Sequence, residues 1–197
     1  MKKFGQTKNQ NPKTIIGIDY SLTSPAVCVN HNGKINFYYL TSKKKYVGEM
    51  SKNIIGCEHK EYKTPIHRFS QISDWAFDII KETFHSSQKI YIEGYSFGSK
   101  GRGIFQIAEN CGILKYRLQE HKIHYDTIVP SVVKKLASGK GNADKEKMYQ
   151  SFVEHTNVDL KKLFDMEKLN NPVTDIIDSF YIAKFGYDNM KNQVKSS

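Results

Sequence analysis

Hydrophobic and polar residues alternate along the chain in patterns that predict a mixed α/β fold. Residues 15–18, Ile-Ile-Gly-Ile, are almost continuously apolar, which predicts a strand covered on both faces in the middle of a sheet. The runs 25–30 and 34–40 are separated by Asn32-Gly33, the strongest short hairpin signal, so three antiparallel strands are expected. Further strands are predicted at 88–93 and 123–129.

Helical spacing of apolar residues predicts the elements that cover this sheet. Two amphipathic helices are expected at 66–84 and 104–118, and Gly112 inside the second predicts a close packing contact. Three later helices are predicted, one beginning at Pro130, one carrying Met148, Phe152 and Val153, and a last one containing residues 175–183. Residues 41–65 break the periodicity and are interpreted as an inserted loop or flap.

Four acidic residues occupy positions that are common in catalytic and ligand-binding sites. Asp19 and Glu93 each end a predicted strand, at the edge where open α/β sheets collect ligands. Asp175 and Asp178 are three residues apart and therefore neighbours on one helix face. Taken singly, the first two are ordinary turn or cap residues, and the second pair complements a helix dipole. Together they would repel one another unless cations neutralise them, which favours hard divalent ions such as Mg²⁺ or Mn²⁺.

Composition points to a polyanionic partner. The 197 residues suit one domain, and 30 Lys and Arg against 20 Asp and Glu give a net charge of +10. Nucleic acid is the first partner class that this excess favours, and an anionic membrane the second. No signal peptide and no apolar run of membrane-spanning length is present, so an intracellular, cytoplasmic protein is expected. Three widely spaced cysteines argue against a disulfide framework.

Two glycine-containing segments carry basic residues. Residues 94–103 combine four glycines with Tyr95, Phe97, Lys100 and Arg102, and lack the Gly-Lys-Ser/Thr ending of a P-loop. Such a loop suits a nucleic-acid backbone and an unstacked base, although a surface loop with its aromatics tucked beneath it is an equal interpretation. Lys140 and Lys145 lie near the start of a predicted helix, where cations oppose the helix dipole, so another use for them is indicated.

The order of these elements and acids resembles the ribonuclease H-like nucleases, and within them the RuvC-type Holliday junction resolvases. The resemblance covers Thr14 to about Phe185, and its order and spacing are more specific than any one motif. The matching segments are Gly17-Ile18-Asp19-Tyr20-Ser21, Ile92-Glu93-Gly94, Pro130-Ser131-Val132-Val133-Lys134-Lys135, Gly139-Lys140-Gly141-Asn142-Ala143-Asp144-Lys145 and Asp175-Ile176-Ile177-Asp178. The insert at 41–65 and the longer loop at 98–103 look more like divergent phage-type members, in a bacterial or phage-infected host.

The resemblance implies a ribonuclease H-like fold with a five-stranded mixed sheet, three strands antiparallel and two parallel, flanked by helices. It implies that Asp19, Glu93, Asp175 and Asp178 bind two Mg²⁺ ions, with Mn²⁺ as a substitute, Asp175 serving either as a ligand or as a supporting group beside the ligands. The resemblance further implies that Lys145 lies near the scissile phosphate. It also implies an aromatic residue at the junction centre, either Tyr95 or Phe97 with Phe97 favoured, and a homodimer with two symmetric active sites.

The function expected from the sequence is therefore a crossover junction endodeoxyribonuclease that cuts four-way and other branched DNA. The DNA contacts expected beside the acids are Tyr95, Phe97, Lys100, Arg102, Lys140 and Lys145. Two alternatives stay open: hydrolysis of RNA in RNA–DNA hybrids, and a non-catalytic branched-DNA-binding module. The domain is expected to span 14–187, between a flexible basic arm at 1–13 and a flexible tail at 188–197.

Overall fold

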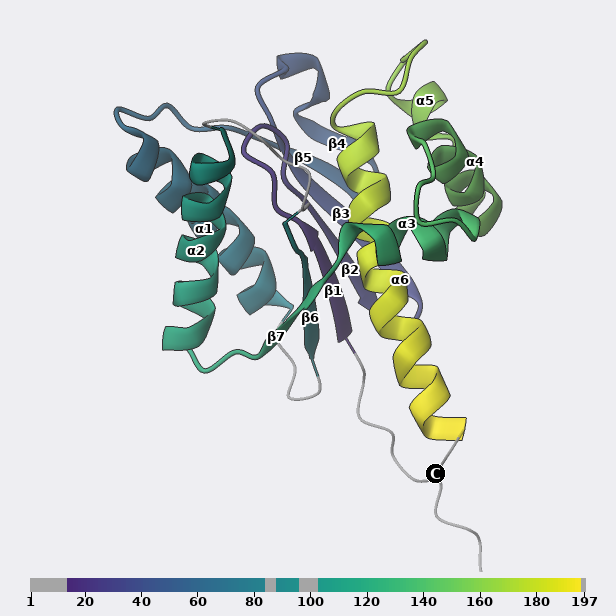
Figure 1. The fold of residues 1–197 in the computed structure, drawn as a ribbon. Coiled ribbons are helices and arrows are strands. Elements are labelled where there is room, and N and C mark those ends of the chain that lie inside the picture. The colour runs from purple at the N-terminus through teal and green to yellow at the C-terminus, as the bar shows by residue number, and fades with distance from the viewer. Residues whose placement is uncertain (1–13, 84–87, 96–102, 196–197) are drawn as a thin grey trace, which may run out of the picture.

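One seven-stranded mixed sheet forms the centre of the molecule, with helices on both faces (Figure 1). The computed structural model describes residues 14–83, 88–95 and 103–195, and the side chains of these up to residue 190. The strand order is β4-β5-β3-β2-β1-β6-β7, so β1 lies inside the sheet as its apolar run predicts. The strands are β1 Thr14–Asp19, β2 Ala26–His31, β3 Lys34–Thr41, β4 Gly48–Ser51, β5 Ile54–Glu58, β6 Lys89–Glu93 and β7 Tyr125–Ile128.

The pairing of the strands follows the predicted pattern and extends it. Strands β1, β2 and β3 form an antiparallel meander, and β6 and β7 add in parallel on the other side of β1. The expected number of five strands is wrong, because the segment 41–65 contributes two more. Strand β5 pairs in parallel with β3, and β4 pairs antiparallel with β5. These strands have only four and five residues, and β4 is short, polar and largely exposed, so neither produces a periodic signal long enough to identify.

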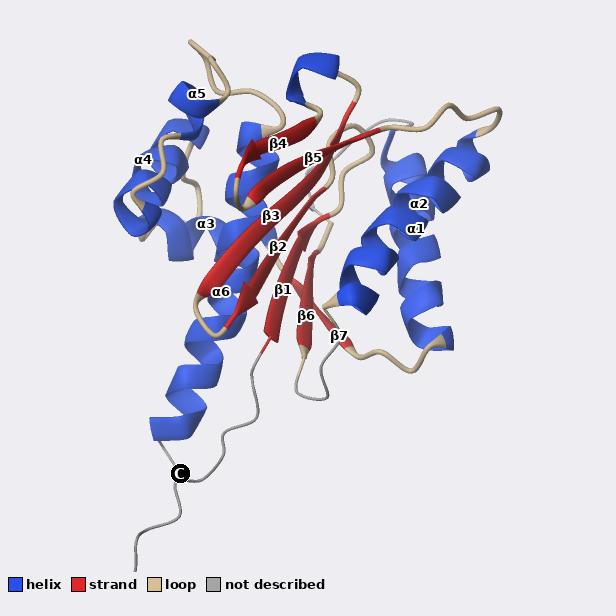
Figure 2. Ribbon diagram, turned by 180° about the vertical axis from the view of Figure 1, so that it is seen from behind, coloured by secondary structure: helices blue, strands red, loops and turns tan. Residues whose placement is uncertain are grey.

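The helices form two layers, one on each face of the sheet (Figure 2). Helices α1 and α2 cover one face, and the long C-terminal helix α6 with α3 and α4 covers the other. The helices are α1 Pro65–Glu82, α2 Gly103–Glu120, α3 Pro130–Ser138, α4 Lys145–Thr156, α5 Leu160–Leu163 and α6 Val173–Lys195, with a 3-10 turn η1 at Lys44–Tyr46. Among these helices, none is both long and apolar enough to cross a membrane.

Alternation along β1 separates two hydrophobic cores. Ile15 belongs to the core beneath α6, whereas Ile16 and Ile18 belong to the core beneath α1 and α2. Gly17 faces α6, and a Cβ atom there would overlap the backbone of Ala183 and of Ser179. Because glycine removes that obstacle, α6 lies directly against the β1 backbone.

Candidate active site

Two strand-ending acids lie side by side on the face of the sheet that α6 covers. In the parallel register, Ile18 of β1 pairs with Ile92 of β6, so the next residues, Asp19 and Glu93, are neighbours. Side chains alternate along each strand, and both acids are two residues beyond a position facing α6, Gly17 in β1 and Tyr91 in β6. The predicted placement of these two acids at one edge of the sheet is therefore observed.

Helix α6 brings the remaining two acids to the same place. Asp175 and Asp178 lie in its first two turns, on the side that also carries Ser179 and Ala183 against β1. The start of the helix is held by Thr174, whose hydroxyl donates to the side-chain oxygen of Asn171 at 2.9 Å. Asp19 and Asp175 are each only 8% exposed.

Burial raises the pKa values of all four carboxyl groups, and repulsion by neighbouring acids adds to the rise at Asp19, Glu93 and Asp175. Burial is the largest cause at Asp19, whose pKa lies well above its ordinary value, and the charges of the other three acids add to the rise. Burial also raises the pKa of Glu93 and of Asp175 to about 7. The pKa of Asp178 is raised to about 6 by burial. The four acids therefore form one electrostatic unit in which ionisation of each opposes that of the others.

Two lysines partly offset this charge. Lys145 lowers the pKa of Asp175 and Asp178, and Lys134 lowers that of Glu93 and Asp178, although burial remains the larger effect in each case. Lys145 is the first residue of α4, which Asp144 caps by accepting from the backbone N–H of Lys147 at 2.8 Å. Neither lysine is within ion-pair distance of an acid in the part of the chain that the structure describes.

Sequence reasoning singled out Lys145 but missed Lys134. The helical spacing could have identified it. Lys134 follows the buried Val133 and lies three residues before the buried Ala137, which places it beside the inward face of α3. The neighbouring Lys135 is exposed. The segment containing both lysines was already part of the resemblance. The structure shows that Lys134, and not Lys135, borders the cleft.

The acids and lysines border a cleft of about 800 Å³. Asp19, Glu93 and Asp178 line it together with Lys134 and Lys145. Asp175 does not line the cleft, but it adjoins Asp19 and raises the pKa of that carboxyl group through charge and hydrogen bonding. The opposite wall is apolar and comes from α2, through Ile104, Ile107 and Cys111. A cleft of this shape places hard oxygen ligands and cations on one side and a nonpolar surface on the other.

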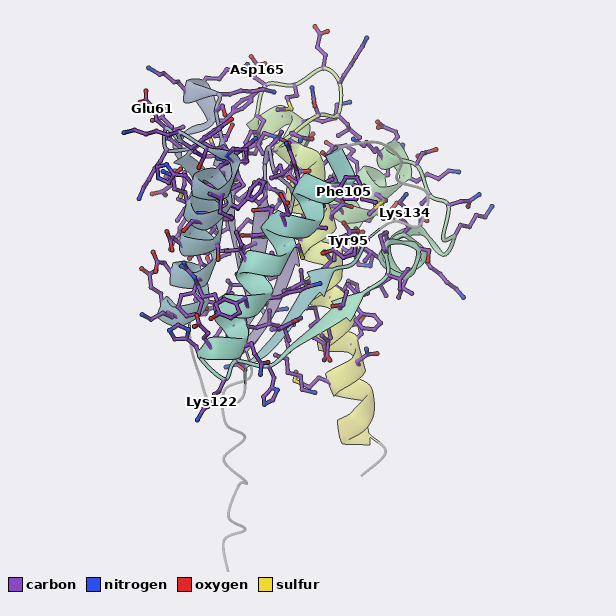
Figure 3. All side chains as sticks on the ribbon, turned by 60° about the vertical axis from the view of Figure 1, so that its left-hand side comes forward. Glu61, Tyr95, Phe105, Lys122, Lys134 and Asp165 are labelled. Carbon is purple, nitrogen blue, oxygen red and sulfur yellow. The ribbon has the colours of Figure 1, made fainter. Side chains whose placement is uncertain are left out.

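The predicted DNA-binding residues differ in where they lie. Tyr95 lines the cleft together with Lys134 and is 43% exposed; both are labelled near the middle of the view in Figure 3. Its hydroxyl donates to the backbone oxygen of Ala108 at 3.5 Å, a weak contact, and the Lys115 ammonium group lies over its ring, 5.1 Å from the centroid. Lys140 is exposed in the turn between α3 and α4 and does not line the cleft. Phe97, Lys100 and Arg102 lie outside the described residues.

The acids suit a hard divalent cation by chemistry, but their side chains do not enclose one ion as they stand. All the donors are carboxylate oxygens, the ligands that Mg²⁺ and Mn²⁺ prefer. Asp175 Oδ2 is buried without a hydrogen-bond partner, which is the state expected of an oxygen kept for a cation. Within the described ranges, however, no three His, Cys, Asp or Glu side chains are grouped closely enough to hold an ion together.

A clamp that sequence reasoning also missed fixes the loop after β1. His59, just beyond β5, donates from Nε2 to the carbonyl oxygen of Thr23 at 2.9 Å. Arg68 of α1 donates from Nη2 to the carbonyl oxygen of Leu22 at 2.7 Å. Both residues are distant in sequence from the loop, and no local pattern predicts such contacts. The loop that follows Asp19 is thereby attached to the segment 41–65 and to α1.

Three solved structures are similar to this chain over nearly its whole length. Thermus thermophilus RuvC has 13% sequence identity and a TM-score of 0.55, covering 90% of this chain and 96% of that one. T. thermophilus RuvC in complex with a Holliday junction substrate has 12% identity and a TM-score of 0.56, with the same coverage. The yeast mitochondrial Holliday junction resolvase Ydc2 has 16% identity and a TM-score of 0.56, covering 92% of this chain and 84% of that one.

The likeness lies in structure and not in sequence. No protein-family model matches the chain, and no curated protein matches it. At identities of 12 to 16%, the three structures establish the arrangement of helices and strands. The chain has the ribonuclease H-like fold of the RuvC-type resolvases, as its sequence predicts.

Proposed function

We propose that this chain is a metal-dependent endonuclease that cuts four-way and other branched DNA near the crossover. The observation that carries the proposal is the meeting of four carboxylates, from β1, β6 and α6, at a cleft that three of them line, in a protein with a net charge of +10. Keeping these buried carboxylates ionised beside one another costs folding free energy, and bound divalent cations would remove that cost. The fold shared with Holliday junction resolvases supports the same activity.

The four acids and the two lysines each have a role in this proposal. Asp19, Glu93, Asp175 and Asp178 would hold two Mg²⁺ ions, which supply an activated water and stabilise charge on the phosphoryl group when bound. Lys134 and Lys145 border the same cleft and would oppose the negative charge that develops on the phosphate oxygens. Because both lysines already lower the pKa of Asp178, they also favour the ionised ligand set that a cation needs.

DNA branching would be recognised at the other wall of the cleft. Tyr95 presents a half-exposed ring beside the apolar residues of α2, and an unpaired base could stack on the ring face that Lys115 does not cover. The positive net charge would supply the affinity for the DNA backbone that does not depend on sequence.

We also propose that two copies of the chain act together. A four-way junction has two symmetry-related strands to cut, and a two-fold dimer presents two sites in the matching arrangement. The outward face of α2 offers a surface for association, since Phe105 and Tyr116 are 69% and 64% exposed and Gly112 between them has open space around it.

Cleavage of an immobile synthetic four-way junction tests the proposal directly. The junction is incubated beside linear, flap and RNA–DNA hybrid duplexes of matched sequence, with Mg²⁺ or with Ca²⁺. Paired symmetric nicks on the junction with Mg²⁺ alone are expected. Cutting of the hybrid alone would instead indicate a ribonuclease, and binding without cutting of any substrate would indicate a recognition module.

The variant Asp19→Asn separates catalysis from binding. Loss of this carboxylate should lower the rate of junction cleavage by about 10³-fold or more, because a metal ligand at the reacting centre is missing. Junction affinity, measured by gel shift in Ca²⁺, should be unchanged or higher. Unfolding of the variant or loss of its DNA binding would count against the metal role of Asp19.

A further inference from the structure

A second groove adjoins the cleft and has the opposite chemical character. Its volume is about 280 Å³, and it lies between the loop after β1, the end of β3 and the residues that precede α6. It is lined by Thr23, Ser24, Thr41, Ser42, Lys43, Asn170 and Asn171. Thr23 also lines the cleft, so the two hollows share a wall.

The groove is built from groups that bind anions. Of its seven described lining residues, four carry hydroxyl groups, two carry amides, one is a lysine and none is acidic. Hydroxyl, amide and ammonium groups are the donors that proteins direct at phosphate oxygens. The cleft beyond Thr23, by contrast, is lined by four acidic residues, Asp19, Glu93, Asp144 and Asp178. An anion is therefore favoured in the groove, and the volume accommodates a phosphodiester group.

The lysine of the groove is only weakly engaged. The Lys43 ammonium group donates to the backbone oxygen of Asn171 at 3.3 Å, a long and exposed contact that a phosphate can replace. The Ser24 hydroxyl is buried beside the Asp175 carboxyl group and lowers the pKa of that group as a hydrogen-bonding neighbour.

The walls of the groove are held in place. The backbone N–H of Lys43 donates to Thr41 Oγ1 at 3.1 Å, which fixes the start of the lysine's segment at the end of β3. On the other side, His59 and Arg68 hold the carbonyl groups of Thr23 and Leu22. A groove whose shape is set before the ligand arrives loses less entropy on binding.

We propose that this groove binds a backbone phosphate of the DNA, next to the phosphate that is cut in the cleft. The inference rests on the proposed nuclease function and deepens it by naming a contact that fixes the position of the cut strand. It also gives the segment 41–65 a function, since Lys43 and His59 both belong to it.

Salt-dependent binding of matched lysine variants tests this inference. All measurements use the full chain carrying Asp19→Asn, so that the four-way junction is bound and not cut. Lys43→Gln should weaken junction binding by about 3- to 10-fold at 0.1 M salt, and should reduce the slope of log affinity against log salt by about 1. Lys44→Gln is the control, because it removes the same charge from an exposed neighbour that does not line the groove. It should leave both quantities nearly unchanged.

Uncharged methylphosphonates then locate the contact. They replace the phosphates near the cut site one at a time, and one position should lower the affinity of the Asp19→Asn protein but not that of the protein also carrying Lys43→Gln. Two results would overturn the inference. One is an equal loss of junction affinity for Lys43→Gln and Lys44→Gln. The other is a Lys43→Gln protein whose affinity is still lowered by a methylphosphonate at every position.

Failure of the groove and failure of the nuclease proposal have different signatures. If the chain with Asp19 intact cuts junctions while Lys43→Gln and Lys44→Gln bind alike, only the groove is wrong. If no junction is bound or cut, the proposed function fails, and the same pair of variants is compared on linear duplex DNA. A selective loss for Lys43→Gln there supports the groove, and equal binding overturns it.

Discussion

The two faces of strand β1 are packed in different ways. On one face Ile16 and Ile18 are covered by the aliphatic side chains of α1 and α2, as in an ordinary sheet. On the other face Gly17 and Asp19 meet α6, whose backbone approaches the strand directly. The acids lie only on the second face, where the absence of a side chain at Gly17 allows close approach. On the face that assembles the site, the strand therefore has no side chain at Gly17.

Glycines in the helices of the two layers have different surroundings. On its inner side α6 is packed as closely at Gly186 as at Gly17, since a Cβ at Gly186 would overlap the ring of Tyr91. Helix α2 has no such contact at Gly112, where a Cβ would meet nothing within 4 Å. The close packing expected at Gly112 from the sequence is therefore absent within the described chain. Glycine marks tight packing in α6 and an open surface in α2.

The largest effect is expected from Gly17→Ala. One added methyl group would overlap the backbone of Ala183 and Ser179, which cannot move without displacing α6. We expect the free energy of unfolding to fall by about 3 kcal/mol or more, measured by urea denaturation. The matched control on the other face is Ile18→Val, which removes one methyl group and should cost about 1 kcal/mol. A Gly17→Ala protein as stable as Ile18→Val would contradict the close packing of α6.

Residues that follow a local rule could be predicted, and residues joined only by the tertiary fold could not. The apolar run before Asp19 and the spacing of Asp175 and Asp178 are local patterns, and they gave the strand, the helix and the acids. Strands β4 and β5 were missed because each is too short for periodicity. The contacts of His59 and Arg68 with the loop after β1 join residues 36 and 46 positions apart, which no sequence pattern encodes.

The second-largest effect is expected from removing the buried carboxyl group of Asp178 on the α6 face, because its ionisation lowers the free energy of unfolding. The pKa of Asp178 is raised by burial to about 6 in the folded protein, from an ordinary value of 3.8. Between these values the folded state binds more protons than the unfolded state, so stability falls as pH rises through this window. We expect Asp178→Asn to be more stable than the parent protein by about 1 to 3 kcal/mol at pH 8 in EDTA, and nearly equal to it at pH 4.

Added Mg²⁺ provides the control for this effect. A cation that binds the folded state should raise the stability of the parent protein at pH 8. The same addition should raise the stability of Asp178→Asn less, because a ligand is missing. Urea denaturation at both pH values, with EDTA or Mg²⁺, gives all four comparisons. An Asp178→Asn protein less stable than the parent at pH 8 in EDTA would show that the carboxylate stabilises the fold.

The smallest effect, and the sharpest test of the open face, is expected from Gly112→Ala. The added methyl group meets nothing within 4 Å, and alanine is favoured over glycine inside a helix. We therefore expect the free energy of unfolding to rise by about 0.5 to 1 kcal/mol, measured at low protein concentration, where a dimer dissociates. A loss of stability there would mean that the face is packed within one chain. A gain that turns into a loss at high concentration would place a second copy over Gly112, because a methyl group then separates the paired helices.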